Sequence, residues 1–421
     1  MSNFRKLILY LVCNLVLAHT AYSQATKSPF SAFGVGEFYG NALAHNQGMA
    51  GVGISNPQYA YLNNKNPALL VFNAYTVFES GIVGEKRTIK NGEVSEKNKS
   101  ANLNYLAIGF PVKRGKWSTA TGLMPYTNVN YKFNYLQNIN GSSGTATVLE
   151  SGSGGINKVF WSNGVALNDD FSIGVTMNHL FGSIDKSYAN RLTNTQQQVI
   201  FVPTIKEHAY YKNNSFSLGF SFHKDSVFKK QYRLNFGLIY DFKTNVNTTT
   251  NALIQNYVGN TPNSSDSLSN QRGITTLPQT IGIGISLSKA NFTIGADIQY
   301  LDYTQYKDFK GQNPNSQGVW SVALGSEFKP SSASPGSYLK QITYRTGVSL
   351  DQYPFLVNNN KMQDLGINFG LSLPMHGSSV DIGLKAGKRG DVKLNTIAEN
   401  YIKLYFGVTF NDQWFIKRKF D

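Results

Sequence analysis

The sequence has very little cysteine: Cys13 is the single one among 421 residues. It lies in residues 1–23, which have the plan of a secretory signal peptide, with a basic start, a short apolar run and a small-x-small exit. The alternative, a lipoprotein acylation site, is disfavoured because Val12 precedes the cysteine where such sites have a small residue. Cleavage after Ser23 leaves a mature chain without cysteine, which excludes disulfides and thiolate metal sites.

Long apolar runs and acidic residues are also scarce. No segment after residue 23 approaches 18 consecutive apolar residues, so the mature sequence holds no candidate transmembrane helix. The 24 acidic residues are outnumbered by 39 basic ones, a net charge of +15, and loss of Arg5 and Lys6 with the signal leaves +13. In a cytosolic protein this excess would suggest nucleic acid. In an exported chain it indicates anionic membrane lipid or a solvated rim instead, with no nucleic-acid partner.

What the sequence has in abundance is alternation. Aromatic residues make up 13% of the chain and charged residues only 15%, and 39 glycines are spread along it. Apolar and polar residues alternate with a period of two, which is typical of strands with two different faces. The clearest runs lie at 171–177, 216–222, 232–242, 281–287, 292–300, 365–373, 380–386 and 402–410.

Weaker runs raise the expected number of strands to about fourteen. The links between the strands are alternately short and long. Short links such as 167–170 and 288–291 alternate with long polar loops such as 243–277. This is typical of a transmembrane barrel with brief periplasmic turns and long outer loops. A soluble β-sandwich would also alternate apolar and polar residues, but it does not require this asymmetry. The sequence predicts an all-β fold, a transmembrane antiparallel β-barrel of about 14 strands over residues 74–421.

Residues 24–73 precede the first expected strand and are rich in glycine, asparagine and small apolar residues. A barrel of about fourteen strands encloses a lumen that leaks unless something blocks it. The segment therefore has a suitable size and place for an internal plug. The alternative, a flexible periplasmic tail, is less favoured because the segment is neither highly charged nor poor in apolar residues.

Two short motifs in this segment resemble the N-terminal hatch of the long-chain fatty acid transporter (FadL-type) family, which includes toluene and xylene uptake proteins. They are "QGMAGVG" (47–53) and "NPAL" (66–69). Residues 152–184 and the closing stretch 411–421 are similar to the barrel and tail of members from the Bacteroidetes. The hatch residues that the resemblance singles out are Gly48, Gly51, Gly53, Asn66, Pro67 and Ala68.

The resemblance implies a hatch-closed barrel in the outer membrane of a Gram-negative bacterium, through which hydrophobic small molecules such as long-chain fatty acids enter passively. In that family the ligand leaves sideways, where the third strand kinks. The third expected strand contains "TGLMPYTNVNY" (121–131), and Gly122 and Pro125 are candidates for weakening its pairing, since proline lacks a backbone N–H. A strand bend without a transport role is the alternative. The aromatics expected to contact ligand are Phe30, Phe33, Phe38 and Tyr39.

Two other functions are open. Some Bacteroidetes relatives with this fold serve protein secretion as partners of a larger translocon, and fold alone does not separate them from importers. A barrel enzyme would need a histidine with acidic or hydroxyl partners, and no HExxH, GxSxG or clustered carboxylate motif occurs in the sequence. The sequence predicts no enzyme activity, no metal site and no cofactor.

Overall fold

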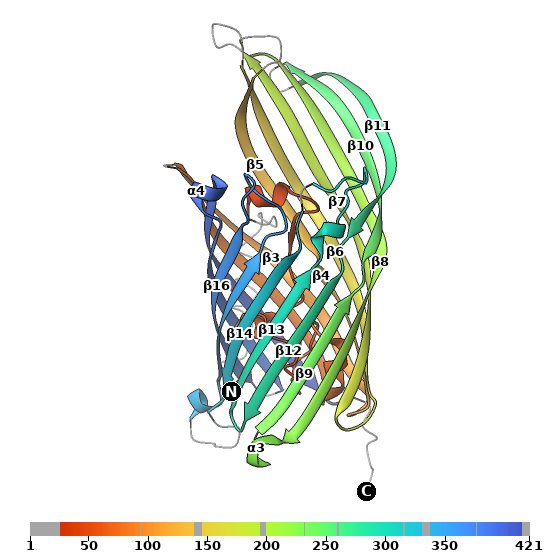
Figure 1. The fold of residues 1–421 in the computed structure, drawn as a ribbon, viewed down its shortest axis with the longest axis vertical. Helices are drawn as coiled ribbons and strands as arrows, with labels where there is room; N and C mark the ends of the chain where they lie inside the picture. The colour runs from red at the N-terminus through yellow and green to blue at the C-terminus, as the bar shows by residue number, and fades with distance from the viewer. Residues whose placement is uncertain are drawn as a thin grey trace, which may run out of the picture.

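The computed structural model describes residues 26–92, 94–138, 145–193, 199–230, 232–258, 261–314, 316–330, 337–375 and 377–414. Over these residues the chain forms one antiparallel sheet that closes on itself, because the last strand, β18 (Ala398–Asp412), pairs with β2 (Thr76–Asn91) (Figure 1). The predicted signal peptide and residues 415–421 of the predicted tail motif lie outside the described residues.

Between β2 and β18, the strands follow one another around the wall in chain order. They are β3 (Val94–Lys113), β4 (Trp117–Pro125), β5 (Thr127–Asn138), β6 (Thr145–Ala166), β7 (Phe171–Thr193), β8 (Val199–Ser226), β9 (Tyr232–Asp241), β10 (Thr244–Val258), β11 (Thr261–Leu277), β12 (Thr280–Lys289), β13 (Phe292–Leu301), β14 (Val319–Phe328), β15 (Thr343–Gln352), β16 (Gln363–Met375) and β17 (Ser378–Arg389). The remaining elements are short: β1 (Glu37–Phe38), α2 (Ala44–Gln47), α3 (Val227–Lys230), α4 (Val392–Asn395) and the 3-10 turns η1 (Pro29–Ala32), η2 (Pro67–Phe72), η3 (Tyr303–Gln305) and η4 (Tyr338–Lys340).

Three of the wall strands are interrupted and carry two labels each. Both β4 and β5 pair with β6, and both β9 and β10 pair with β8. In the same way β11 pairs with β10, and β12 pairs with β9. Counting each interrupted strand once and leaving out the two-residue β1, the 18 strands make a wall of fourteen. The structure confirms the predicted antiparallel barrel of about fourteen strands.

The two faces of the wall differ as the alternation predicts. On β7 the outward side chains Ile173 and Val175 are 44% and 43% exposed, whereas the inward Ser172 and Thr176 are buried. Lipid offers no hydrogen-bond partners to a backbone, so only a closed sheet with an apolar exterior can span it. Within the described ranges, no helix is long and apolar enough to cross a membrane.

The wall is much taller on one side than on the other. The 28-residue β8 is nearly three times as long as the 10-residue β14, since each strand residue adds about 3.3 Å. The tall side, which carries β5, β10 and β11, forms the upper end of the molecule in Figure 1. We name it the tall wall, meaning the outer parts of strands β5 to β8, β10 and β11.

The N-terminal segment, residues 26–73, contributes to two large apolar clusters with the inner face of the wall, besides a small one around Met49 and Val52. One contains Val35 together with Tyr131, Tyr303 and Phe355, so it joins the segment to the tall wall and to two outer loops. The other contains Leu43, Leu62 and Leu70 with residues of β2, β3 and β4. Figure 1 shows this segment, in red and orange, running through the interior of the barrel.

Candidate functional site

The third wall strand is broken at the proline that the sequence analysis singles out. Strand β4 ends at Pro125 and β5 begins at Thr127. The break does not detach the strand from its neighbour on one side, because the backbone N–H of Tyr126 donates to the carbonyl of Ile156 on β6 at 2.8 Å. Pairing with β6 continues on both sides of the break.

On its other side the broken strand separates from β3. The last pair between β3 and β4 is Leu106 with Leu123. Just beyond it, Asn104 is an extra residue in β3, where the pairing with β2 shifts register between Gly81 and Ile82. Within the described residues, no pairing joins β5 to β3. We call this open line between β3 (residues 94–105) and β5 the seam.

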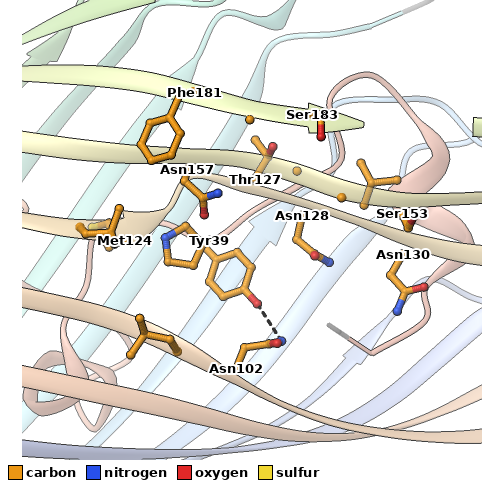
Figure 2. Close-up of a pocket in the computed structure, with 17 residues that line it drawn as sticks. Tyr39, Asn102, Met124, Thr127, Asn128, Asn130, Ser153, Asn157, Phe181 and Ser183 are labelled. Atoms are coloured by element: carbon orange, nitrogen blue, oxygen red, sulfur yellow. Dashed lines mark hydrogen bonds between the residues drawn. The ribbon is translucent and has the colours of Figure 1, made fainter. Parts of the chain in front are cut away.

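A cavity of about 750 Å³ lies at the lower end of the seam. Figure 2 shows Tyr39 of the N-terminal segment in its middle, with the side chain of Asn102 donating to the Tyr39 hydroxyl at 3.4 Å. Met124, Pro125 and Phe181 line it together with several asparagines. The lining thus combines apolar surface with polar groups.

Gly122 lies below the seam, in the regular part of the wall. It pairs with Ala107 on β3 and with Phe160 on β6. A Cβ atom at this position would come within 2.7 Å of the Phe160 ring, so glycine is required here for close packing. Of the two predicted residues, Pro125 lies at the break and Gly122 within the ladder.

The four predicted aromatics divide into two pairs. Phe30 is 1% exposed and packs beside Tyr353, and Phe33 stacks on Phe355 with ring centroids 5.7 Å apart. Phe38 and Tyr39 instead line a second cavity, of about 360 Å³, in the lumen. Tyr39 also lines the seam cavity, so its side chain lies between the two spaces.

The N-terminal segment crosses the seam and contacts both of its edges. The hydroxyl groups of Thr26 and Ser100 on β3 are 2.5 Å apart. Two residues later, the N–H of Ser28 donates to the carbonyl of Asn130 on β5 at 2.8 Å. Further along, the two-residue β1 pairs with the edge of β5. We call residues 26–31 the strap.

A buried charge cluster ties the same segment to strands β2, β17 and β18, which follow β3 around the wall. Glu37 accepts bonds from Arg87 on β2 and from Arg389 on β17, and both arginines also pair with Glu399. Burial alone would raise the pKa of Glu37, but the charges of Arg389 and Arg87 outweigh it and hold the pKa well below its ordinary value. Sequence analysis missed this residue, although Glu37 is the one acid between residues 24 and 73.

The lower part of the segment is bonded to the wall through backbone groups. The carboxylate of Asp297 on β13 accepts from the N–H groups of Gly53 and Ile54 at 2.9 and 3.1 Å, and from the ammonium group of Lys65 at 3.1 Å. The side chain of Asn66 donates to the carbonyls of Ile54 and of a β8 residue. These bonds hold the segment across the lumen.

The other residues of the predicted hatch motif also meet the wall or turn the chain. Gly48 lies against Gly370, so closely that a Cβ on Gly48 would come 2.7 Å from the Gly370 Cα. Gly51 turns the chain with a φ of +82°. Pro67 and Ala68 pack against β7, where the Ala68 carbonyl accepts from the Ser172 hydroxyl at 2.9 Å.

One cation lies beside the break in the wall. Lys158 on β6 pairs with Met124, is only 4% exposed, and donates to the side chain of Asn41 at 2.5 Å. Its ammonium group also lies 5.6 Å from the centre of the Tyr126 ring. In the described part of the chain, no acid lies within ion-pair distance of it. Among those residues, no group of three His, Cys, Asp or Glu is arranged to hold a metal ion.

Solved structures with the same architecture include transporters and channels. The toluene transporter TbuX of Ralstonia pickettii has a TM-score of 0.58 at 13% identity, covering 88% of this chain and 98% of its own. A FadL homologue of Pseudomonas aeruginosa has a TM-score of 0.58 at 10% identity over 89% and 99%, and the Pseudomonas putida toluene transporter TodX has 0.54 at 15% over 88% and 98%. At these identities the likeness concerns the fold. The chain therefore has a FadL-type β-barrel fold.

The sequence itself matches one family. No curated protein matches the chain. The model of the BamG family matches residues 4–421, which is nearly the full length. The chain belongs to the BamG family.

Proposed function

We propose that the protein is an outer-membrane channel for the passive uptake of hydrophobic small molecules, which leave sideways through the seam. The observation that carries this proposal is that β3, which pairs with β2 over residues 94–105, has no partner strand on its other edge among the described residues, beside a cavity of about 750 Å³. An apolar molecule that passes there enters lipid without crossing water, because the outer face of the wall is apolar. The downward route is obstructed by the bonds of Asp297 and Asn66 to the N-terminal segment.

In this proposal the segment of residues 24–73 acts as the hatch. Its strap contacts both edges of the seam, so the strap has to move for a ligand to leave. Tyr39 lies between the luminal cavity and the seam cavity and separates the two. The predicted ligand contacts of Phe38 and Tyr39 agree with these positions, whereas Phe30 and Phe33 support the packing behind them.

A reversible cross-link tests the exit. Removal of the signal leaves no native cysteine, so Thr26→Cys with Ser100→Cys places the only thiols at a hydroxyl contact of 2.5 Å between the strap and the β3 edge of the seam. Oxidation should reduce uptake of radiolabelled toluene and oleate at least tenfold, and a reductant should restore it. The matched control is Thr248→Cys with Thr275→Cys, a hydroxyl contact of 2.8 Å within the tall wall.

Equal uptake by the oxidised and reduced seam pair, with the cross-link verified, would rule out the sideways exit. No uptake by the wild-type protein at all would favour the other predicted function, a partner of a secretion translocon. In that case a larger protein should co-purify with the barrel.

We further propose that Lys158 holds the head group of acidic ligands. It is buried, has no acid within ion-pair distance among the described residues, and pairs with Met124, which lines the seam cavity. Lys158→Gln should raise the half-saturating concentration for oleate uptake about tenfold, because a charge-assisted bond to a carboxylate is lost. Toluene uptake should not change. An equal effect on both ligands would indicate a structural role only.

A further inference from the structure

The outer face of the tall wall carries a groove that the uptake route does not use. It has a volume of about 710 Å³ and lies across strands β5, β6, β7, β8 and β10. We call it the outer groove. Its residues alternate along each strand with the buried inward residues Tyr131, Ile184 and Ala209, which places them on the outward face.

Strand register arranges the polar residues of the outer groove in two parallel rows. The upper row is Lys132, Ser151, Ser187 and Lys206, each paired with the next across neighbouring strands. The lower row is Asn130, Ser153, Asp185, His208 and Asn251, paired in the same way. Since neighbouring strands lie about 4.8 Å apart, the two lysines are about 14 Å apart with short serines between them. The rows thus form a low floor with a long cationic side chain at each end.

The outer groove carries an excess of positive charge. Lys132 and Lys206 are exposed, and within the described residues neither ammonium group has an acid at ion-pair distance. Lys206 is held in place by a bond to the hydroxyl of Tyr257 at 2.7 Å. The one acid of the two rows, Asp185, is already bonded to His208. Lys27 of the strap adds a third cation at the seam side, where it faces Glu96 at 3.8 Å.

The height of the outer groove on the wall indicates what meets it. The outward residues of β7 below it are apolar from Phe171 to Met177, and those of β8 below it include Phe216 and Leu218. A lipid whose acyl chains lie against these residues places its head group at the level of the two rows. Basic residues at such a level bind anionic head groups, and serine hydroxyls next to lysine suit phosphate and sugar oxygens.

We propose that the outer groove binds the phosphorylated saccharide head group of an outer-leaflet glycolipid. Lys132 and Lys206 contact its phosphate groups, and Ser151 and Ser187 contact the sugar between them. The outer groove shares Asn130 and Ser153 with the seam cavity, so a bound lipid lies directly beside the seam.

Native mass spectrometry with a defined lipid tests this site. The protein is purified in mild detergent and titrated with diphosphorylated lipid A. The wild type should bind one molecule, and Lys132→Gln with Lys206→Gln should bind at least tenfold more weakly. The matched control is Lys86→Gln with Lys90→Gln, which removes two exposed lysines of β2 on the low side of the wall. The control should bind as the wild type does.

Two results would overturn the proposal: equal binding by the wild type and the Lys132/Lys206 variant, and equal binding of a glycolipid that carries no phosphate. Competition by millimolar phosphate against bound lipid A would support it. If the double variant does not fold, as judged by heat-modifiable migration on gels, the single variants Lys132→Gln and Lys206→Gln decide, each with an expected loss of at least threefold.

Discussion

At the scale of single residues, the N-terminal segment and the wall approach each other closely at a point where neither side has a side chain. A Cβ on Gly370 would lie 2.6 Å from the Cα of Gly48, and both atoms belong to backbones that are fixed by other bonds. Glycine at 370 is therefore a requirement of the close packing between the segment and β16.

Gly370→Ala should lower the free energy of unfolding by about 1–3 kcal/mol, because overpacking forces the backbone to shift. Gly84→Ala is the control, since the nearest atom to its new Cβ is 3.9 Å away. Thermal unfolding in detergent, followed by circular dichroism, measures both. Equal melting temperatures of the two variants would contradict the packing argument.

Glu37 supports a second prediction at this scale. Glu37→Gln removes the charge that faces two buried arginines, but each of them keeps another acid, so the expected loss is about 1–3 kcal/mol. Because the pKa of Glu37 in the folded state lies below its ordinary value of 4.5, the stabilisation is complete above that value and is lost only as the pH falls towards the lower one.

Because the pKa of Glu37 is lowered, the stabilisation by its carboxylate has a defined pH dependence. The difference in melting temperature between the wild type and Glu37→Gln should be the same at pH 8 and at pH 6, and it should shrink below about pH 4.5. A difference that already shrinks between pH 8 and pH 6 would show that the carboxylate is not held by the arginines.

At the scale of elements, the seam depends on irregularities in two strands. Pro125 ends β4, and Asn104 is the extra residue in β3 at nearly the same height. Pro125→Val restores a backbone N–H and a strand-forming side chain, which favours further pairing of the third strand with β3. Toluene uptake should fall several-fold in a well-folded Pro125→Val variant.

The control for that variant is Pro111→Val. Pro111 lies on β3 and pairs with Ser118, next to a register shift near the short link between β3 and β4 and away from the break at Pro125. Uptake by the control should equal that of the wild type. Unchanged uptake by Pro125→Val would show that the proline is not required for the exit, even if the ligand leaves through the seam.

The wall could be predicted from the sequence, whereas the seam could be predicted only in part. The alternation of runs such as 281–287 predicted the wall, because a period of two is a property of each strand alone. The break at Pro125 could be predicted as well, because the lack of a backbone N–H is a property of that residue alone. The bulge at Asn104 was not, since a bulge is a relation between two strands. The pairing of Glu37 with Arg389 depends on contacts across 352 residues, which no local pattern reports.

At the scale of the whole molecule, the bonds between the segment and the wall decide whether the barrel leaks. Asp297→Ala removes the acceptor of two N–H groups and of Lys65. The lower part of the segment should loosen, and single-channel conductance in planar bilayers should rise above that of the wild type. The control is Asp351→Ala, a wall carboxylate that bonds to Ser321 and faces Lys385 but not the segment. Equal conductance of both variants would exclude Asp297 as a seal.

The way the N-terminal segment is bonded also sets the order in which this protein can be assembled. The segment is synthesised first, yet Ser28 bonds to Glu399 across 371 residues, Gln47 to Asn368 across 321, and Gly53 to Asp297 across 244. None of these partners is in place until nearly the whole wall is present. The earliest part of the chain therefore completes its contacts last, and it has to be enclosed by the sheet before β18 meets β2.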